Sequence, residues 1–283
     1  MKISGRIKVV GIFGDPIAHT ISPYMHNAAF EAMGLEFVYV PWRVRPDSIK
    51  DAVSAIKALE IAGVNVTIPH KEKVVPFLDW VDEEAVKIGA VNTIVNKNGK
   101  LFGYNTDGRG YWMSLFSETG FDANGKNIIV LGAGGAALAI AFSLLGKKPR
   151  SVIIANRTVD RAKSIAGEFA KLHPEIDLKA SGLDISKYMA DADLLINTTS
   201  SGMTEEKKPP LSIHGLSKAA IVSDIVYRPP QTPLLKEAEK AGHKVHRGLG
   251  MLIWQGALSF TLWTGLPAPV DTMRFAAVQA LGV

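Results

Sequence analysis

Apolar runs of strand length alternate with helical patterns along almost the whole chain. In the first part of the chain, strands are predicted where β-branched residues cluster: residues 8–13, 36–41, 63–68 and 90–96. Helices are predicted between them, over residues 22–33 and 46–59. Asn98-Gly99 lies between two apolar runs, residues 91–97 and 100–104, and predicts a tight hairpin. Because a tight hairpin joins antiparallel strands, we expect a mixed sheet here.

After Gly110 the pattern becomes a regular alternation of strand and helix. Strands are predicted in this part over residues 127–131, 151–156, 194–198, 220–226 and 244–246. Helices such as residues 136–145 and 233–241 separate most of them, which is typical of a doubly wound parallel sheet. Residues 251–283 are again helical, have no strand to pair with, and are expected to pack on the first domain.

The pattern predicts an α/β protein of two domains with a cleft between them. Residues 1–106 and 248–283 form the first, mixed-sheet domain, and residues 107–247 form a Rossmann-type, doubly wound domain. A length of 283 residues with 47% hydrophobic side chains is enough for two cores. The absence of cysteine excludes disulfides, thiolate nucleophiles and cysteine metal sites, and it fits a cytoplasmic protein. The longest apolar run, residues 136–145, is about half a membrane span, so no membrane association is expected.

A formal net charge of +5 raises the question of nucleic-acid binding. The basic residues are scattered, however, and they follow no nucleic-acid-binding motif. A small anionic substrate or cofactor accounts for the excess equally well. We therefore expect a small-molecule partner and no nucleic acid.

A glycine-rich loop follows the predicted strand over residues 127–131. Its residues, Gly132-Ala133-Gly134-Gly135-Ala136-Ala137, match the G-x-G-x-x-A form of the dinucleotide fingerprint. Gly132 permits the tight turn, Gly134 lets the backbone approach a pyrophosphate, and Ala137 lets the helix pack close to the strand. The helix N-terminus adds free N–H groups and the positive end of its dipole. A plain tight turn is the alternative, but the flanking strands and helix favour a dinucleotide site.

The end of the next strand indicates which dinucleotide binds. An NAD site usually has Asp or Glu there to bind the ribose 2′-hydroxyl. This chain has Asn156-Arg157-Thr158, with Arg161 one turn later. Two guanidinium groups and a hydroxyl suit a 2′-phosphate, which favours NADP and disfavours an adenosylmethionine-dependent methyltransferase. The alternative is a solvated, basic helix start.

The first domain carries three polar clusters that packing alone does not require. The first, residues 14–27, contains the hydroxyls of Thr20 and Ser22 at a predicted helix start. Ser22 suits the N-cap and Pro23 the first helical position, yet the same helix start is also suited to bind an anion.

The second cluster is residues 65–72, in which a strand is predicted to end near Thr67 and Pro69 to open a helix. Lys71 then lies in the first turn, where the helix dipole disfavours a cation, as suits a group that gives up a proton. A surface lysine is the alternative on spacing alone. The third cluster joins residues 90–93 to residues 105–108 and contains Asn92 and Asp107.

Together these clusters resemble the shikimate dehydrogenase family, in the family's order and over nearly the whole chain. The matching motifs are residues 14–27, 65–71, 89–93, 105–108, 132–136, 156–158, 197–203 and 248–256. The resemblance implies a reversible, NADP-linked reduction of 3-dehydroshikimate to shikimate, on the route to chorismate and the aromatic amino acids. It also implies that Lys71 is the acid–base group and Asp107 its hydrogen-bonding partner, with no metal.

The resemblance further implies which side chains bind the two ligands. Substrate contacts are expected from Thr20, Ser22, Thr67, Lys71, Asn92, Asp107, Tyr227 and Gln255, with Thr20 and Ser22 on the carboxylate. Cofactor contacts are expected from Gly132, Ala133, Gly134, Gly135, Ala136, Asn156, Arg157, Thr158, Arg161, Thr198, Met203 and Gly248. His243 and His246 are expected on a strand surface, and the protein is expected to be a monomer or a homodimer.

Two positions depart from the family pattern. Thr20 stands where the family usually has Ser, and Leu138 stands where many members have Arg. The alternatives are a quinate/shikimate dehydrogenase of broader range and a catalytically silent NADP-binding protein. Lys71 and Asp107 together argue against the silent protein, because a binding module needs no such pair.

Overall fold

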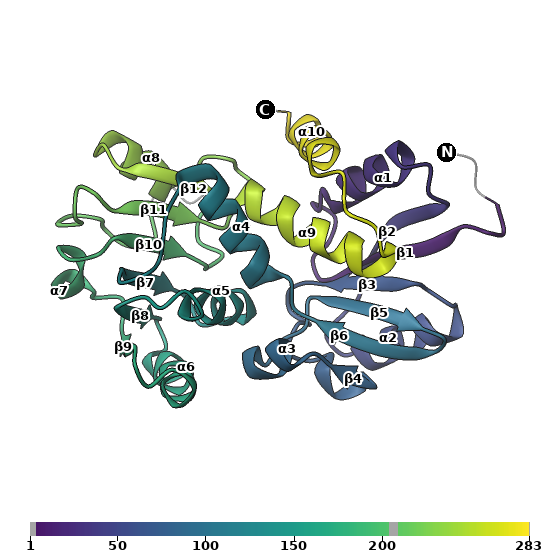
Figure 1. Ribbon diagram of the computed structural model, residues 1–283, viewed down its shortest axis with the longest axis horizontal. Coiled ribbons are helices and arrows are strands. Elements are labelled where there is room, and N and C mark those ends of the chain that lie inside the picture. Colours follow the sequence, from purple (N-terminus) through teal and green to yellow (C-terminus); the bar gives the residue numbers. More distant parts are fainter. Residues whose placement is uncertain (1–3, 204–208, 283) are drawn as a thin grey trace. The chain divides into compact units, whose positions relative to one another are not determined.

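The structure, a computed structural model, describes residues 4–203 and 209–282. It divides into two compact units, Met1–Gly110 with Ile253–Val283, and Tyr111–Leu252. The chain passes from one unit to the other within helices α4 (Asp107–Thr119) and α9 (Gly248–Thr264) (Figure 1). The predicted boundaries lie at the first residues of these helices, whereas the two units divide inside them, after Gly110 and after Leu252.

The first unit is built on a six-stranded mixed sheet with strand order β2-β1-β3-β5-β6-β4. Its strands are β1 (Lys8–Gly14), β2 (Phe37–Arg43), β3 (Gly63–Val66), β4 (Trp80–Val81), β5 (Thr93–Lys97) and β6 (Lys100–Tyr104). β5 runs antiparallel to both of its neighbours, β3 and β6. The predicted hairpin is confirmed, since Lys97 pairs with Lys100 and the turn residues Asn98 and Gly99 have positive φ angles of 53° and 80°. A tight hairpin turn with two positive φ angles favours this Asn-Gly pair.

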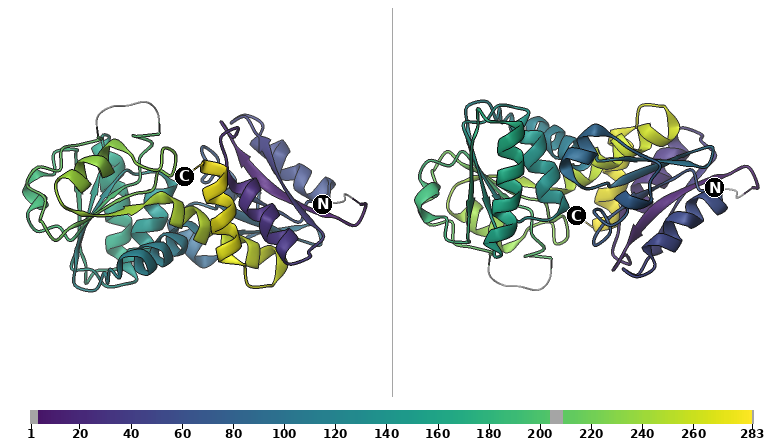
Figure 2. Two further views of the ribbon diagram at one scale, coloured as in Figure 1. Left: turned by 90° about the horizontal axis from the view of Figure 1, so that it is seen from above. Right: turned by 90° about the horizontal axis from the view of Figure 1, so that it is seen from below.

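Helices cover both faces of this sheet. They are α1 (Ser22–Ala32), α2 (Ile49–Ala58), α3 (Glu83–Ile88), α10 (Val270–Leu281) and the short 3₁₀ helix η1 (Val75–Phe77), with the C-terminal half of α9. α2 buries Ile49, Val53 and Ile56 at helical spacing in the core of this unit. α10 lies beside α1 (Figure 2), and the Phe30 and Phe260 rings stack with centroids 5.1 Å apart.

The second unit contains a fully parallel sheet with strand order β12-β11-β10-β7-β8-β9. Its strands are β7 (Asn127–Leu131), β8 (Ser151–Ala155), β9 (Asp177–Ser181), β10 (Leu194–Asn197), β11 (Ile221–Asp224) and β12 (Lys244–Arg247). This confirms the predicted doubly wound α/β fold. β9 was not predicted from the sequence. It lies at the sheet edge, where only Leu178 and Ala180 pack against the core, so its sequence has no continuous apolar run.

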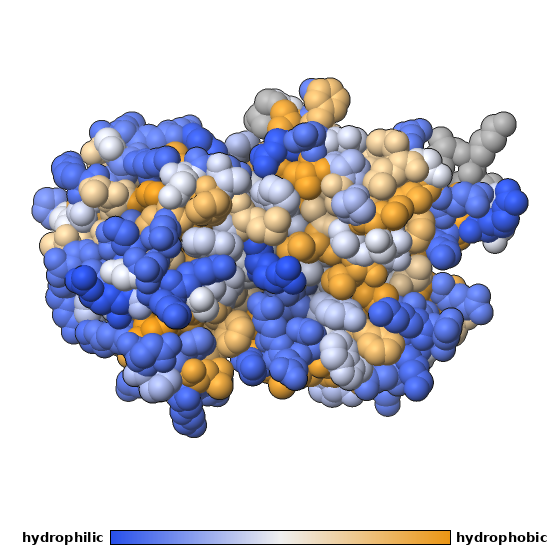
Figure 3. All heavy atoms as spheres, in the orientation of Figure 1, coloured by the Kyte–Doolittle hydropathy of each residue, from blue (hydrophilic) through white to orange (hydrophobic). Residues whose placement is uncertain are grey.

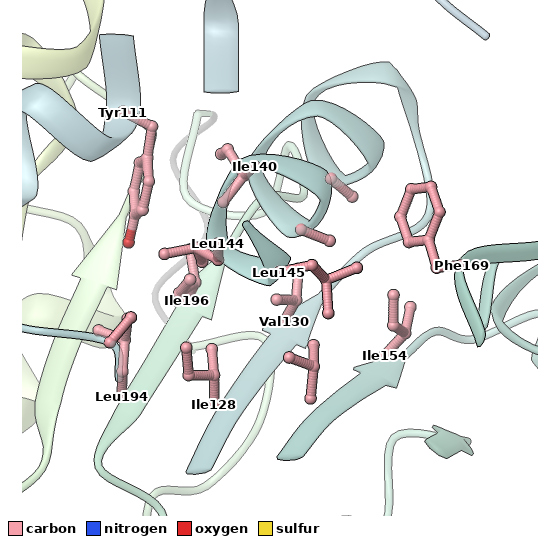
Figure 4. Packing of buried hydrophobic residues seen from close by; sticks show 14 of the residues in the cluster. Tyr111, Ile128, Val130, Ile140, Leu144, Leu145, Ile154, Phe169, Leu194 and Ile196 are labelled. Carbon is pink, nitrogen blue, oxygen red and sulfur yellow. The ribbon is translucent and has the colours of Figure 1, made fainter. Parts of the chain in front are cut away.

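Helices cover both faces of this sheet, and successive strand residues point alternately to one face and the other. Ile128 and Val130 face α5 (Gly135–Leu145) and α6 (Val159–Leu172), in the core shown in Figure 4. Ile129 and Leu131 face the opposite core, formed with α7 (Ser186–Met189) and α8 (Pro233–Lys240). Burial on both faces explains the near-continuous apolar runs in the sequence of these strands.

The expectation of surface histidines is wrong. His243 and His246 are only 7% and 1% exposed. His246 lies between two hydroxyls, with Nε2 2.8 Å from Ser114 Oγ and Nδ1 2.9 Å from Ser223 Oγ. β12 is an edge strand, but Ser114 and Tyr111 of α4 pack over His246 and bury it. This burial lowers the pKa of His246 to about 4.

Across residues 4–203 and 209–282, none of the helices combines the length and the apolar character that crossing a bilayer demands. On the face shown in Figure 3, hydrophilic side chains predominate and apolar side chains are interspersed among them.

Candidate active site

Lys71 and Asp107 form a largely buried ion pair in the first unit. Lys71 Nζ donates a hydrogen bond of 2.6 Å to Asp107 Oδ2, and the two side chains are 16% and 5% exposed. Asp107 is the first residue of α4, and Lys71 lies in the segment that follows β3. The alternative of a solvated surface lysine is therefore excluded.

The expected helix at Pro69 is absent. Residues 71–74 form a turn, and only the three residues of η1 follow. His70 O accepts a hydrogen bond from Val74 N, which closes a single turn. Lys71 therefore lies in no helix of its own, and its immediate charged neighbour is the Asp107 carboxylate at the start of α4. The Lys71 carbonyl is held by Val91 N at 2.8 Å, so the segment is anchored to the chain just before β5.

Asn92 holds the second oxygen of Asp107. Its Nδ2 donates to Asp107 Oδ1 at 2.8 Å and to Thr106 Oγ1 at 2.9 Å, while its Oδ1 accepts from Thr106 N at 2.8 Å. Asn105 Oδ1 accepts from Asp107 N at 3.0 Å and so fixes the start of α4. Both oxygens and the backbone of Asp107 are thus held by groups of the protein itself.

A second layer of buried hydrogen bonds lies behind Asn92. Asn65 Nδ2 donates to Ser259 Oγ at 2.9 Å and to Asn92 O at 3.2 Å, and Tyr39 Oη donates to Asn65 Oδ1 at 2.9 Å. Ser259 Oγ also lies 2.8 Å from Thr93 Oγ1. Asn65 and Ser259 are 5% and 0% exposed. Sequence analysis placed Asn65 in a polar cluster. It gave Ser259 no role, because most residues of the α9 sequence are apolar.

α9 brings Gln255 to the same cluster. Its Oε1 lies 3.4 Å from Asn92 Nδ2, and its carbonyl accepts from Thr106 Oγ1 at 3.1 Å. Gly110 makes this approach possible, since a Cβ at that position would lie 2.5 Å from Gln255 N. Lys71, Asn92, Asp107 and Gln255 are therefore brought together as the sequence predicts.

Thr20 and Thr67 lie in the segments that follow β1 and β3, and Ser22 begins α1. Gly14 and Thr67 are adjacent, because a Cβ on Gly14 would lie 2.5 Å from Thr67 Cγ2. The predicted N-cap role of Ser22 is wrong, since Ile21 occupies the N-cap and Ser22 is the first residue of α1. Instead Thr20 Oγ1 accepts from Ser22 N at 3.3 Å. Within the described part of the chain, neither the Ser22 hydroxyl nor the Thr67 hydroxyl forms a hydrogen bond.

The glycine loop of the second unit has the conformation that the fingerprint predicts. Gly132 has a φ of +116°, and a Cβ there would lie 2.4 Å from Thr198 Oγ1. At Gly134 an added Cβ would meet no protein atom within 4 Å, so the backbone there is open to approach. α5 begins at Gly135, and Ala137 is buried against the core. Ala133 is buried, and Ala136 lies half-buried in the first turn of α5. The loop therefore fits a dinucleotide pyrophosphate.

The basic residues after β8 are exposed at the start of α6. Thr158 is the N-cap of α6, and Asn156 Nδ2 donates to Thr158 O at 2.9 Å. Arg157 and Arg161 are both exposed. Among residues 4–203 and 209–282, the Arg157 guanidinium has no hydrogen-bond or ion-pair partner. The nearby Asp160 forms an ion pair of 3.5 Å with Lys163.

The second unit also contains four further residues predicted to bind a ligand: Thr198, Met203, Tyr227 and Gly248. Gly248 is the first residue of α9. Thr198 Oγ1 donates to Leu131 O at 2.6 Å, and the Met203 side chain is 55% exposed. A Cβ at Gly248 would lie 2.2 Å from Ile225 O, so only glycine fits there. Tyr227 is half-buried, and burial raises the pKa of its hydroxyl.

No group of three or more His, Cys, Asp or Glu side chains that could hold a metal ion occurs in the part of the chain that the structure describes. Sequence analysis placed Asn197 in the motif of residues 197–203 without a role and missed Asp224; the two residues lie at the ends of β10 and β11. Asp224 is fully buried, and burial raises the pKa of its carboxyl to about 6. Its position at a strand end was the available signal.

Three family models match the chain. They are described as the shikimate dehydrogenase substrate binding domain (residues 12–94), shikimate/quinate 5-dehydrogenase (residues 115–208) and the shikimate 5'-dehydrogenase C-terminal domain (residues 248–277). A shikimate dehydrogenase (NADP(+)) of Alkaliphilus metalliredigens is 46% identical over 96% of this chain and 97% of its own length.

Two solved structures show how far the similarity extends. The shikimate 5-dehydrogenase of Thermus thermophilus, in complex with NADP(H) and shikimate, is 38% identical with a TM-score of 0.88, over 97% of this chain and 100% of that chain. A quinate dehydrogenase of Corynebacterium glutamicum, in complex with NAD, is 30% identical with a TM-score of 0.88, over 96% of this chain and 99% of that chain.

Proposed function

The chain belongs to the shikimate dehydrogenase family, and we propose that it catalyses the reversible, NADP-linked reduction of 3-dehydroshikimate to shikimate. This oxidoreductase reaction is a step toward chorismate and the aromatic amino acids. The observation that carries the proposal is the buried Lys71–Asp107 pair, whose Nζ–Oδ2 distance is 2.6 Å. A protein that only bound these ligands would gain nothing from burying an ion pair, because desolvating two charges is costly.

Lys71 acts as the acid–base group in this proposal. When bound, the nicotinamide supplies or receives the hydride at the substrate carbon. In the direction of reduction, Lys71 Nζ donates a proton to the substrate oxygen as it becomes a hydroxyl. The ammonium charge also stabilises the negative charge that develops on this oxygen. Asp107 and Asn92 hold Lys71 in position, so little rearrangement is needed during the reaction.

The substrate is held by hydroxyl and amide groups of the first unit. The Ser22 hydroxyl and Thr20 bind the carboxylate at the start of α1, and the Thr67 hydroxyl and Gln255 bind ring hydroxyls. Asn92 has three hydrogen-bonded neighbours on its amide nitrogen, Thr106, Asp107 and Gln255. We therefore assign it chiefly to positioning Asp107, with substrate contact as a lesser role. Tyr227 completes the substrate set.

NADP is bound by the second unit. Gly132, Ala133, Gly134, Gly135 and Ala136 take the pyrophosphate at the N-terminus of α5. The adenosine 2′-phosphate is bound by Asn156, Arg157, Thr158 and Arg161. The unpartnered, exposed guanidinium of Arg157 supports this role, because it is available for a bidentate bond to phosphate. Thr198, Met203 and Gly248 lie at the nicotinamide end.

In domain terms, residues 1–106 and 248–283 are the substrate-binding part and residues 107–247 the NADP-binding part. We place the protein in the cytoplasm, where a biosynthetic enzyme without cysteines suits the reducing environment. We propose a monomer or a homodimer.

Quinate is the second candidate substrate, favoured by the similarity to an NAD-bound quinate dehydrogenase. A steady-state assay with shikimate and quinate, each with NADP+ and NAD+, separates the alternatives. We expect the highest kcat/KM for shikimate with NADP+. Equal or better turnover of quinate with NAD+ would contradict the proposal, and the absence of turnover with all four pairs would indicate a silent binding protein.

A further inference from the structure

Asp224 is a buried carboxylate that the proposed chemistry does not use. It is the last residue of β11 and is 0% exposed. A buried carboxylate is costly unless its oxygens are hydrogen-bonded, so the partners of Asp224 indicate what it holds in place.

Both carboxylate oxygens of Asp224 are engaged. Oδ1 accepts from Asn197 Nδ2 at 3.1 Å and from Val226 N at 3.0 Å, and Oδ2 accepts from Thr232 Oγ1 at 2.7 Å. Through Val226 and Thr232, the carboxylate therefore fixes the segment that follows β11. Across the sheet it reaches the last residue of the neighbouring strand, β10.

Asn197 passes this anchoring on to the segment after β10. Its Oδ1 accepts from Thr199 N at 3.1 Å and Thr199 Oγ1 at 2.7 Å, and its Nδ2 also donates to Ser201 O at 3.3 Å. Thr198, between these contacts, donates to Leu131 O and lies against Gly132 of the glycine loop. Residues 198–203 are thus bonded at one side to the fingerprint strand and at the other to the Asp224–Asn197 pair.

The network lies at the carboxyl-end edge of the sheet, beside the point between β10 and β7 where the strand order reverses and where ligands of such sheets bind. β10 and β11 are adjacent parallel strands, with Asn197 paired to Asp224 in register. Their carboxyl ends form the sheet edge that binds dinucleotides in doubly wound folds. Neither Asn197 nor Asp224 needs to touch the cofactor to affect its binding, because each acts through the backbone of residues 198–203.

We propose that Asp224 is a positioning residue for the dinucleotide: through Asn197, it holds residues 198–203 in the conformation that binds NADP. The inference rests on the proposed use of NADP by this chain. It predicts that loss of the Asp224–Asn197 link weakens cofactor binding while the first unit, with Lys71 and Asp107, remains intact.

The test measures the dissociation constant of NADP+ by isothermal titration calorimetry and the melting temperature of each variant. Asp224→Ala and Asn197→Ala are each expected to raise the NADP+ dissociation constant at least tenfold. The double variant is expected to lose no more than the more severe single variant, because both changes break one link. Asp224→Asn keeps an acceptor toward Asn197 and Val226 and is expected to restore the constant to within threefold.

Thr232→Val is the matched control: it removes the third hydrogen bond of Asp224 and the N-cap hydrogen bond of α8, but it keeps the Cβ and Cγ2 atoms beside Gly202 and leaves the Asp224–Asn197 link intact. It is expected to leave the NADP+ dissociation constant within threefold of the unmodified protein, and the KM for shikimate at saturating NADP+ should change less than threefold in every variant. If Asp224→Ala does not fold, Asn197→Ala and Asp224→Asn carry the test.

Two results separate the inference from the proposed function. If the unmodified protein does not bind NADP+ in the calorimeter, the proposed function and the inference both fall. If it binds NADP+ and Asn197→Ala or Asp224→Ala binds it equally well, only the inference is overturned. A lowered melting temperature with an unchanged dissociation constant would likewise assign Asp224 to stability alone.

Discussion

The candidate catalytic residues and the candidate cofactor residues are prepared for binding in opposite ways. In the first unit, Lys71, Asn92 and Asp107 are buried or nearly so, and buried partners hold each of them. In the second unit, the fingerprint loop offers open backbone at Gly134, and Arg157 stands exposed.

The difference follows from what each group must do. A proton donor must be fixed at one atom, which buried hydrogen bonds achieve. A guanidinium that is to bind a phosphate must stay exposed until it does so, because burying an unpaired charge costs too much desolvation free energy. Substitutions in the buried network should therefore have large effects on the reaction. Substitutions of exposed residues that bind phosphate should have smaller effects.

Removal of the proton donor should have the largest effect. Lys71→Ala is expected to lower kcat by roughly 10²–10⁴-fold, with a smaller change in KM, because the substrate oxygen loses its acid. The exposed neighbour Lys73 provides the control, and Lys73→Ala should retain normal kcat. Near-normal kcat in Lys71→Ala at neutral pH would show that another group transfers the proton.

A buried histidine of the first unit should make stability depend on pH. His26 is fully buried against Tyr39, with ring centroids 4.4 Å apart, and burial lowers its pKa from 6.5 to about 3. Below pH 6.5, His26 binds a proton in the unfolded chain but not in the folded chain. The free energy of unfolding therefore decreases as the pH falls from 6.5 toward 3. Between pH 7.5 and 5 this loss is about 2 kcal/mol.

Urea unfolding at pH 7.5 and 5 measures this contribution. His26→Phe keeps an aromatic ring and should reduce the pH dependence by about 2 kcal/mol, whatever its absolute stability. His214→Gln, at an exposed position, should leave the pH dependence unchanged. An unaltered difference between the two pH values in His26→Phe would show that His26 does not titrate as its burial implies.

The exposed arginines test the other half of the comparison. Arg157→Ala combined with Arg161→Ala should reduce the preference for NADP+ over NAD+ by more than tenfold, since a charged hydrogen bond to phosphate contributes about 1.5–3 kcal/mol. The ratio of kcat/KM for the two cofactors is the measurement. Lys171→Ala, in the last turn of the same helix, should preserve the ratio. Equal use of NAD+ and NADP+ by the unmodified enzyme would rule out this assignment.

The Ser22 hydroxyl is buried like the catalytic pair but unbonded like Arg157. Ser22→Ala should raise the KM for shikimate about tenfold and lower kcat less, because the carboxylate is bound alike in the ground and transition states. Ser54→Ala, at an exposed position on α2, serves as the control and should leave KM unchanged. An unchanged KM in Ser22→Ala would remove Ser22 from the carboxylate site.

Thr20 should have the smallest effect, on selectivity alone. Its extra methyl group restricts the rotamer and fills space, which disfavours the puckered ring of quinate and its additional hydroxyl. Thr20→Ser should raise kcat/KM for quinate relative to shikimate by a few fold. Comparable turnover of the two substrates by the unmodified enzyme would contradict this reading of Thr20.

The features that sequence analysis predicted correctly are local ones. The Asn98-Gly99 turn and the glycine loop depend on conformations that few residues adopt, so neighbouring residues suffice to identify them. The parallel strands of the second unit are recognisable because burial on both faces requires continuous apolar runs. The failures at Pro69, at Ser22 and at β9 concern ends and edges, where small differences between competing local structures decide the outcome.

Residues distant in the sequence meet only in the tertiary structure, and those contacts decided the rest. The amino-acid sequence by itself determined the two α/β sheets, the dinucleotide loop and the residue types of the site. Only folding buried His246 between Ser114 and Ser223, joined Asp224 to Asn197, and placed Ser259 behind Asn92. The physical reason is that burial and hydrogen-bond satisfaction are properties of the folded interior, where a polar side chain is stable only beside partners from other elements.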